Sequence, residues 1–213
     1  MANLGHLSSL PQGIFRFISV DVETAGRSIA SICQIGLCAV DVSNDLHTYS
    51  TLVDPEEPFD AFNTELHGIN SDMVSGSPTF PEIYETLFDV LQTHQLVQHS
   101  RYDEKAFTAA CVCYGAPMVT SYWTDSVQIA RKAWPELKGA GGHGLASLKD
   151  HLGIDFRHHD AGEDARAAAI VILRAEKTLG KPIRHLRAKQ QLSLRFCESQ
   201  NSSAGCASWI TPS

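Results

Sequence analysis

Three apolar, β-branched segments joined by short connections constrain the fold more than any other feature of this sequence. They lie at residues 14–22, 32–42 and 46–53. Short connections favour antiparallel hairpins, because a parallel pair needs a crossover of a dozen residues or more. We therefore expect the chain to begin with three antiparallel strands in one sheet.

After this hairpin region the sequence alternates between strand-like and helix-like segments. Thr79 and Glu82 have the spacing of a capping box, which marks a helix start. Further strands are predicted at 95–98 and 121–123. Helices are predicted at 79–91, 103–114, 145–152 and 163–179. A further helix is predicted to follow the strand at 121–123 and to end near residue 133. Strands that alternate with helices predict an α/β layered sheet with helices on its faces. The glycine-rich segment 138–144 could cradle a phosphate, but without a GK[ST] sequence we interpret it as a flexible connector.

The composition is that of an ordinary globular chain. Of the 213 residues, 43% are hydrophobic, which is too many for wholesale disorder. The longest apolar run, 167–173, is far shorter than the ~20 residues that span a bilayer, and the first residues resemble no secretory signal. Six cysteines without a Cys-x-x-Cys pair favour reduced thiols. We therefore expect a cytoplasmic protein with no membrane partner.

Polarity and charge divide the chain into three parts. We expect one folded domain at 13–180, an N-terminal extension at 1–12, and a basic, then polar, flexible tail at 181–213. The formal net charge is −7, although segment 174–198 has an excess of Lys and Arg. The acidic remainder either avoids polyanions or concentrates carboxylates around cations, and composition does not decide between the two.

Acidic residues recur where predicted strands end and helices begin. Asp21 and Glu23 lie two apart near the end of the first strand, so their side chains share a face. Like charges this close are costly unless a cation lies between them. Asp103 follows a later strand, and Asp164 opens the last helix with His159 five residues before it. Each feature alone fits solvated acids at element ends. Together they predict an acidic cluster with a histidine beside it.

Taken in order, these residues resemble the three motifs of the DnaQ-like DEDDh 3′→5′ exonucleases. The matching stretches are Asp21-Val22-Glu23-Thr24, Ser100-Arg101-Tyr102-Asp103 and His159-Asp160-Ala161-Gly162-Glu163-Asp164. Further agreement comes from Gln34-Ile35-Gly36, Leu66-His67-Gly68-Ile69, Pro78-Thr79-Phe80 and Trp123-Thr124-Asp125. The resemblance covers about residues 14–179, and it is specific as a set.

Two positions depart from the family pattern. Ser100 stands where the family commonly has Asn, and His99 precedes it directly. His158 offers a second register for the catalytic histidine, but only His159 has four residues between itself and Asp164. The sister family with a tyrosine would need that residue one place later, where this chain has Asp160, so we reject it.

The resemblance implies an RNase H-like fold, a mixed five-stranded sheet flanked by helices, and hydrolysis supported by two divalent cations. Hard carboxylate oxygens without thiolates select Mg²⁺ or Mn²⁺. By this resemblance Asp21 would bridge both ions, and Glu23 and Asp164 would hold the ion that binds the attacking water. Asp103 would help to position the second ion. His159 would be the general base, because a histidine pKa lies near working pH.

The resemblance also implies how the substrate is held. Thr24, Ala25 and His67 would approach the 3′ end of the nucleic acid. We expect a proofreading or repair enzyme that releases nucleoside monophosphates from DNA 3′ ends, with single strands favoured. One alternative is an RNA-trimming exoribonuclease of the RNase T or oligoribonuclease type. Another is a non-catalytic nucleic-acid or sliding-clamp adaptor.

The tail carries a second resemblance. Segment 191–196 is similar to the hexapeptide by which bacterial proteins bind the replicative sliding clamp, and an extended apolar segment is a known recognition mode. Its clamp-binding candidates are Gln191, Leu192, Leu194 and Phe196. A chance apolar cluster in a basic tail would explain the same residues, and the surrounding Lys and Arg could instead contact phosphates.

Overall fold

The computed structural model describes residues 10–182, and it contains a mixed five-stranded sheet with the order β3-β2-β1-β4-β5. The strands are β1 (Phe15–Thr24), β2 (Ile32–Asp41), β3 (Leu46–Leu52), β4 (Leu96–Gln98) and β5 (Trp123–Asp125). Strands β1, β2 and β3 pair antiparallel, whereas β4 pairs parallel with β1 and β5 parallel with β4. The predicted hairpins and the predicted α/β class are confirmed.

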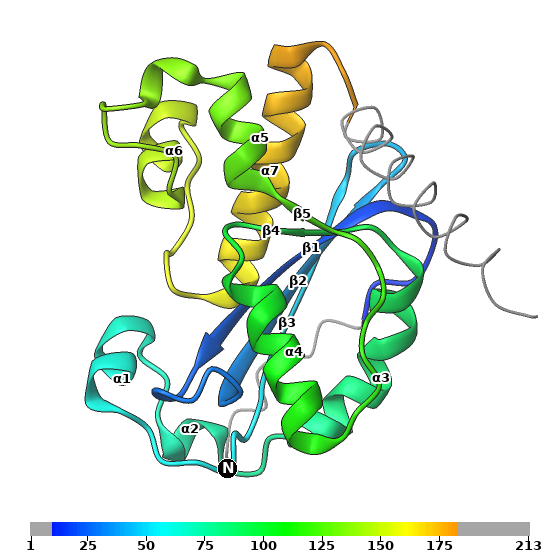
Figure 1. The fold of residues 1–213 in the computed structure, drawn as a ribbon, viewed down its shortest axis with the longest axis vertical. Coiled ribbons are helices and arrows are strands. Elements are labelled where there is room, and N and C mark those ends of the chain that lie inside the picture. Colours follow the sequence, from blue (N-terminus) through cyan, green and yellow to red (C-terminus); the bar gives the residue numbers. More distant parts are fainter. Residues whose placement is uncertain (1–9, 183–213) are drawn as a thin grey trace, which may run out of the picture.

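Helices cover both faces of the sheet (Figure 1). They are α1 (Ala61–His67), α2 (Ser71–Val74), α3 (Phe80–Thr93), α4 (Tyr102–Tyr114), α5 (Ser126–Ala133), the 3-10 turn η1 (Pro135–Leu137), α6 (Leu145–Leu152) and α7 (Ala161–Leu179). Helices α3 and α4 pack on one face, while α5, α6 and α7 pack on the other. On β1, Ile18, Val20 and Val22 belong to the α3–α4 side. Because side chains alternate along a strand, Asp21 and Glu23 face the α7 side.

The first turn of α7 lies unusually close to the sheet. A Cβ atom added to Gly36 of β2 would lie 2.0 Å from the carbonyl oxygen of Ala161, so only glycine permits this approach. Gln34 reinforces the contact, because its side-chain oxygen accepts a hydrogen bond from the Ala161 amide at 3.1 Å. Gly36 is also the register partner of Asp21 on β1. This contact therefore sets the position of Asp164, three residues into the helix, relative to β1.

Several elements differ from the sequence-based expectation. Strand β1 continues to Thr24, and β5 begins at Trp123 rather than at residue 121. Helices α1 and α2 were not predicted, because α1 has no buried residue and α2 has one, so neither shows an apolar periodicity. No helix within residues 10–182 is long and apolar enough to cross a membrane. The limits of the N-terminal extension and of the tail stay predictions, because residues 1–9 and 183–213 lie outside the described part.

Two residues without the freedom of glycine adopt positive φ angles beside the acidic positions. Ser100 has φ 90° in the turn between β4 and α4, and His159 has φ 65° just before α7. Such conformations cost of order 1 kcal/mol or more outside glycine, with Asn the best tolerated alternative. The Asn that is common in the family at position 100 suits this backbone better than Ser does.

Gly36→Ala should lower the free energy of unfolding by about 1–3 kcal/mol or more, because the added methyl group must push α7 away from the sheet. Gly144→Ala is the matched control, since Gly144 has a negative φ and no atom within 4 Å of an added Cβ. The control should change stability by about 0.5 kcal/mol or less. Urea denaturation measures both, and equal effects would contradict the close approach described above.

Substitutions at Ser100 should rank by their tolerance of positive φ. Ser100→Gly should raise the free energy of unfolding by up to about 1 kcal/mol, because it removes the steric cost of φ 90°. Ser100→Val should lower it, because a β-branched side chain fits this conformation worst. The order Gly, Ser, Val in urea midpoints is the expected result, and the reverse order would refute the strain at this turn.

Candidate active site

Three carboxylates meet where β1 passes under the start of α7. Asp21 and Glu23 come from β1, and Asp164 comes from the first turn of α7. One oxygen atom from each of the three lies within 4.8 Å of the others. Figure 1 shows this end of α7, in yellow, lying against β1 and β2. The predicted convergence of these three acids is therefore present in the fold.

Asp103 joins the cluster from the opposite side of the sheet. It lies in the first turn of α4 and is only 3% exposed. Its Oδ1 accepts a hydrogen bond from the backbone amide of Val22 at 3.1 Å, and Val22 is the residue between Asp21 and Glu23. Burial raises the pKa of Asp103 to about 7, although this hydrogen bond favours the charged form and partly opposes the rise.

Burial raises the pKa values of all four acids, and neighbouring acids add to the rise for three of them. Burial raises the pKa of Glu23 to about 8, with further contributions from the charges of Asp164 and Asp103. The pKa of Asp21 is raised well above its usual range, first by burial and then by its charged neighbours. Burial also raises the pKa of Asp164. The ionised form of these carboxylates is therefore unfavourable without a cation. Divalent cations prefer oxygen ligands and would offset the repulsion, so the cluster is suited to bind them.

A bend before α7 brings two histidines to these acids. His159 Nδ1 lies 4.0 Å from Glu23 Oε1, so the turn at positive φ directs this side chain toward the cluster, as the sequence predicted. Burial lowers the pKa of His159, and the neighbouring His158 lowers it further. His158 Nδ1 lies 3.0 Å from both carboxylate oxygens of Asp164. Within residues 10–182, His158 and His159 form the only ion pairs recorded for the four carboxylates.

The sequence did not predict the contact between His158 and Asp164. The signal was present, because His158 precedes His159 directly and gave the alternative register. Asp160 caps the N-terminus of α7, because its side chain accepts hydrogen bonds from the Gly162 and Glu163 amides. The chain bends at this cap, between the loop and the helix. That bend is what places a residue six positions before Asp164 against its carboxylate.

The three predicted substrate-binding residues lie at the end of β1 and at the end of α1. Thr24 Oγ1 is 2.9 Å from the Tyr102 hydroxyl. Ala25 is completely buried, and His67 donates from Nε2 toward the Thr24 carbonyl oxygen at 3.2 Å. Nδ1 of His67 accepts from the Ile69 amide at 3.0 Å, which fixes this tautomer. Their role toward a nucleotide stays a prediction.

Exposed apolar side chains surround these residues. Phe62 and Leu66 of α1 are 73% and 43% exposed, and Tyr102 at the start of α4 is 43% exposed. α1 and α4 are both tied to Thr24, since Asn63 Nδ2 donates to its carbonyl oxygen at 2.8 Å and Tyr102 contacts its hydroxyl. Aromatic and apolar surfaces of this kind can stack nucleic-acid bases.

The glycine-rich segment 138–144 is not part of this acidic cluster. The glycine-rich segment 138–144 is held by the His143 ring, which contacts the Trp134 carbonyl oxygen at 2.8 Å, and by the His143 carbonyl, which lies 3.0 Å from His99 Nε2. These contacts fit a connector. The clamp-binding candidates at 191, 192, 194 and 196 lie outside the described residues.

Comparison with known proteins identifies the family. The model of the RNase T exonuclease family matches residues 18–172. The DNA polymerase III PolC-type of Streptococcus agalactiae serotype III is 30% identical over 155 residues, which cover 71% of this chain and 10% of that protein. The corresponding protein of Clostridium perfringens is 29% identical over 159 residues, which cover 73% of this chain and 11% of that protein. The chain thus matches only about a tenth of the length of these relatives.

Solved structures share the fold. Exonuclease X in complex with 5′ overhanging duplex DNA aligns with a TM-score of 0.62 and 19% identity over 77% of this chain and 93% of that one. The nuclease domain of 3′hExo, a DEDDh family member bound to rAMP, aligns with a TM-score of 0.63 and 17% identity over 78% of this chain and 94% of that one. The RNase H-like sheet expected from the sequence is confirmed. Since the family model covers well over half of the chain, this protein belongs to the RNase T family of exonucleases.

Proposed function

We propose that this chain is a metal-dependent 3′→5′ exonuclease that releases nucleoside monophosphates from DNA 3′ ends during proofreading or repair. One observation carries the proposal. Asp21, Glu23 and Asp164 converge within 4.8 Å of one another, and Asp103 is fixed to the same strand through the Val22 amide. A cytoplasmic location fits this role.

The four acids are the proposed ligands of two divalent cations, Mg²⁺ or Mn²⁺. Their donor atoms are all carboxylate oxygens, which these ions prefer. When bound, such ions stabilise negative charge on a phosphodiester and lower the pKa of water. Burial around the cluster strengthens every electrostatic interaction within it, because little bulk water screens the charges.

His159 is the proposed general base. Its lowered pKa keeps the imidazole neutral near pH 7, so a ring nitrogen can accept the proton of the attacking water. The resulting hydroxide attacks the terminal phosphorus, and the bond to the 3′ oxygen of the preceding nucleotide breaks. That oxygen leaves with the bonding electron pair and takes a proton from water. Glu23, 4.0 Å from Nδ1, stabilises the imidazolium that forms.

The terminal nucleotide is proposed to bind between α1 and α4. The end of β1 is lined here by Thr24, Ala25 and His67. The side chain of Ala25 is buried, so it cannot contact the nucleotide directly. The exposed Leu66 and Tyr102 offer apolar surfaces to a base.

The choice of DNA rests on the relatives. The PolC-type relatives are DNA polymerases by name, and the exonuclease X structure contains duplex DNA. An RNA-trimming activity remains the second candidate, because the 3′hExo structure contains rAMP and the carboxylates read phosphate rather than sugar. A non-catalytic adaptor is disfavoured because all five motif residues are present. Clamp binding through 191–196 stays a prediction, which a pull-down with and without residues 190–213 would test.

A single assay tests the proposal. Matched DNA and RNA oligonucleotides, single- and double-stranded and labelled internally or at either end, are incubated with Mg²⁺ or with EDTA. Release of mononucleotides from the 3′ end of DNA, abolished by EDTA, is the expected result. Faster release from RNA would favour the second candidate, and no release from any substrate would refute the exonuclease.

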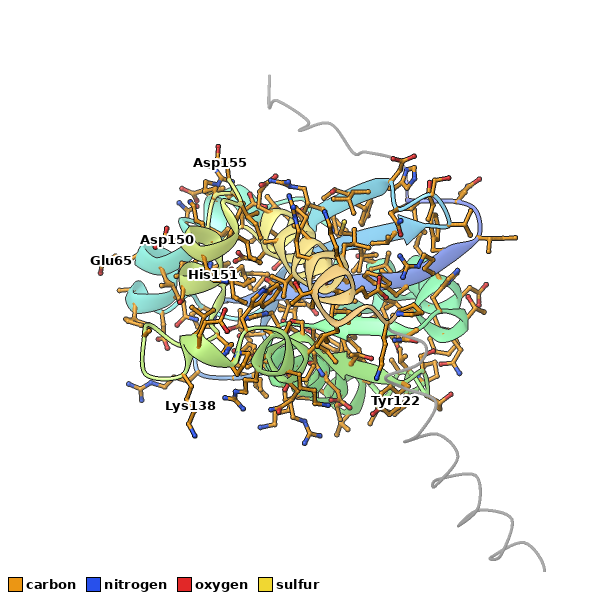
Figure 2. All side chains as sticks on the ribbon, turned by 90° about the horizontal axis from the view of Figure 1, so that it is seen from above. Glu65, Tyr122, Lys138, Asp150, His151 and Asp155 are labelled. Carbon is orange, nitrogen blue, oxygen red and sulfur yellow. The ribbon has the colours of Figure 1, made fainter. Side chains whose placement is uncertain are left out.

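Asp21→Asn should separate activity from stability. Loss of one carboxylate should lower kcat by roughly 10³-fold, because charge stabilisation by the bound cations is worth several kcal/mol. The same change should raise the thermal midpoint in EDTA, because it removes one charge from a repelling cluster. The matched control is Asp150→Asn, because Asp150 is an exposed residue of α6 (Figure 2), and this change should affect neither quantity. An active Asp21→Asn enzyme would contradict the assignment.

Stability without metal should fall as pH rises. Glu23 and Asp103 have pKa values of about 8 and about 7 in the folded chain, above the carboxyl values near ~4 of an unfolded chain. The folded state therefore holds more protons, and its stability declines from about pH 4 to pH 8. Thermal midpoints in EDTA should decrease from pH 5 to pH 8, and Mn²⁺ should raise them more at pH 8. Glu23→Gln should flatten the decline, and a midpoint that rises with pH would contradict the shifts.

A further inference from the structure

We propose that His158 is a positioning residue that orients both Asp164 and His159 for the reaction. This role deepens the proposed function and rests on it. Neither the motif pattern nor the spacing to Asp164 assigns His158 a part, because His159 alone satisfies the motif. The geometry around the two rings points to this second histidine.

The first contact fixes the carboxylate of Asp164. His158 Nδ1 lies 3.0 Å from Oδ1 and 3.0 Å from Oδ2. The His159 amide also lies 3.1 Å from Nδ1, but Asp164 Oδ2 is nearer to that amide. An ionised carboxylate only accepts hydrogen bonds, so Nδ1 carries the proton of the contact with Asp164 and the amide donates to Oδ2 instead. The His159 amide donates to Oδ2 at 2.8 Å. Two donors from the loop therefore hold a side chain that is 4% exposed, and they set the direction of its remaining lone pairs.

The second contact fixes the ring of His159. The two imidazole rings stack with centroids 4.0 Å apart and planes 8° apart. His158 also contacts the ring of Phe156, with centroids 5.9 Å apart and planes at 68°. Phe156 is buried, so it gives His158 a fixed support. The ring of His159, on a strained backbone with φ 65°, thereby gains a defined orientation next to Glu23.

The stacked geometry excludes His158 as a ligand that shares an ion with His159. A metal ion bound to an imidazole nitrogen lies near the plane of that ring, along the nitrogen lone pair. Two nearly parallel planes at this separation cannot both contain one ion. His158 therefore acts through its hydrogen bond and its stack, as do the outer partners that orient the ligands of other metal sites.

Three variants separate the two contacts. His158→Phe keeps the stack and loses the N–H donor, His158→Asn keeps a side-chain N–H donor and loses the stack, and His158→Ala loses both. His151→Phe is the matched control, because His151 lies on α6 (Figure 2) and pairs with Glu136 rather than with any of the four acids. Its side chain is 32% exposed, close to the 38% of His158. Calorimetry measures Mn²⁺ affinity, and steady-state assays on single-stranded DNA measure kcat and KM.

His158→Phe should weaken Mn²⁺ binding by about 10- to 100-fold and lower kcat, with KM for DNA unchanged. His158→Asn should retain most of the Mn²⁺ affinity but lose kcat, because His159 is no longer held. His158→Ala should lose both Mn²⁺ affinity and kcat. Thermal unfolding shows whether each variant is folded, and His158→Ala replaces His158→Phe if the Phe variant is not. His151→Phe should match the wild type.

Wild-type Mn²⁺ affinity in His158→Phe, or equal loss in the Phe and Asn variants, would overturn the role of His158. Absence of hydrolysis by the wild type would instead refute the proposed function, while the Mn²⁺ titrations would still decide whether His158 orients Asp164. A wild-type chain that binds no Mn²⁺ would refute both.

Discussion

Repulsion among four neighbouring carboxylates is the constraint on which the rest of this structure depends. Such a cluster is unfavourable in a folded chain, and burial first and the neighbouring acids second raise the pKa values of Asp21, Glu23 and Asp103. The fold tolerates it because rigid elements hold each acid in place. Asp103 is bound to the backbone amide inside the Asp21–Glu23 pair, and Asp164 is bound by the loop before α7.

The sheet and α7 form one unit around this cluster. Gly36 lets the start of α7 touch β2, and Gln34 joins the helix to the strand through the Ala161 amide. Positive φ angles at Ser100 and His159 turn the chain where β4 leads into α4 and where the last loop leads into α7. Local strain at these two turns is thus compensated by packing elsewhere, as is common at functional sites.

Much of this arrangement could be predicted from the sequence. The apolar segments predicted the hairpins, and the spacing of Asp21, Glu23, Asp103 and Asp164 predicted their convergence, because element ends at one edge of a sheet meet in space. Helices α1 and α2 could not be predicted, because α1 buries no residue and is held by hydrogen bonds to Thr24, and α2 is a single turn that buries only Val74. The contact of His158 with Asp164 depends on a loop conformation that no periodicity encodes.

The attachment of α1 has a consequence for motion. None of its residues is buried, and Asn63 and His67 both reach the same acceptor, the carbonyl oxygen of Thr24. A helix held mainly by polar contacts to one atom opens at low free-energy cost, whereas the central strands open only with global unfolding. We therefore expect the amide hydrogens of α1 to exchange with solvent earlier than those of the central strands.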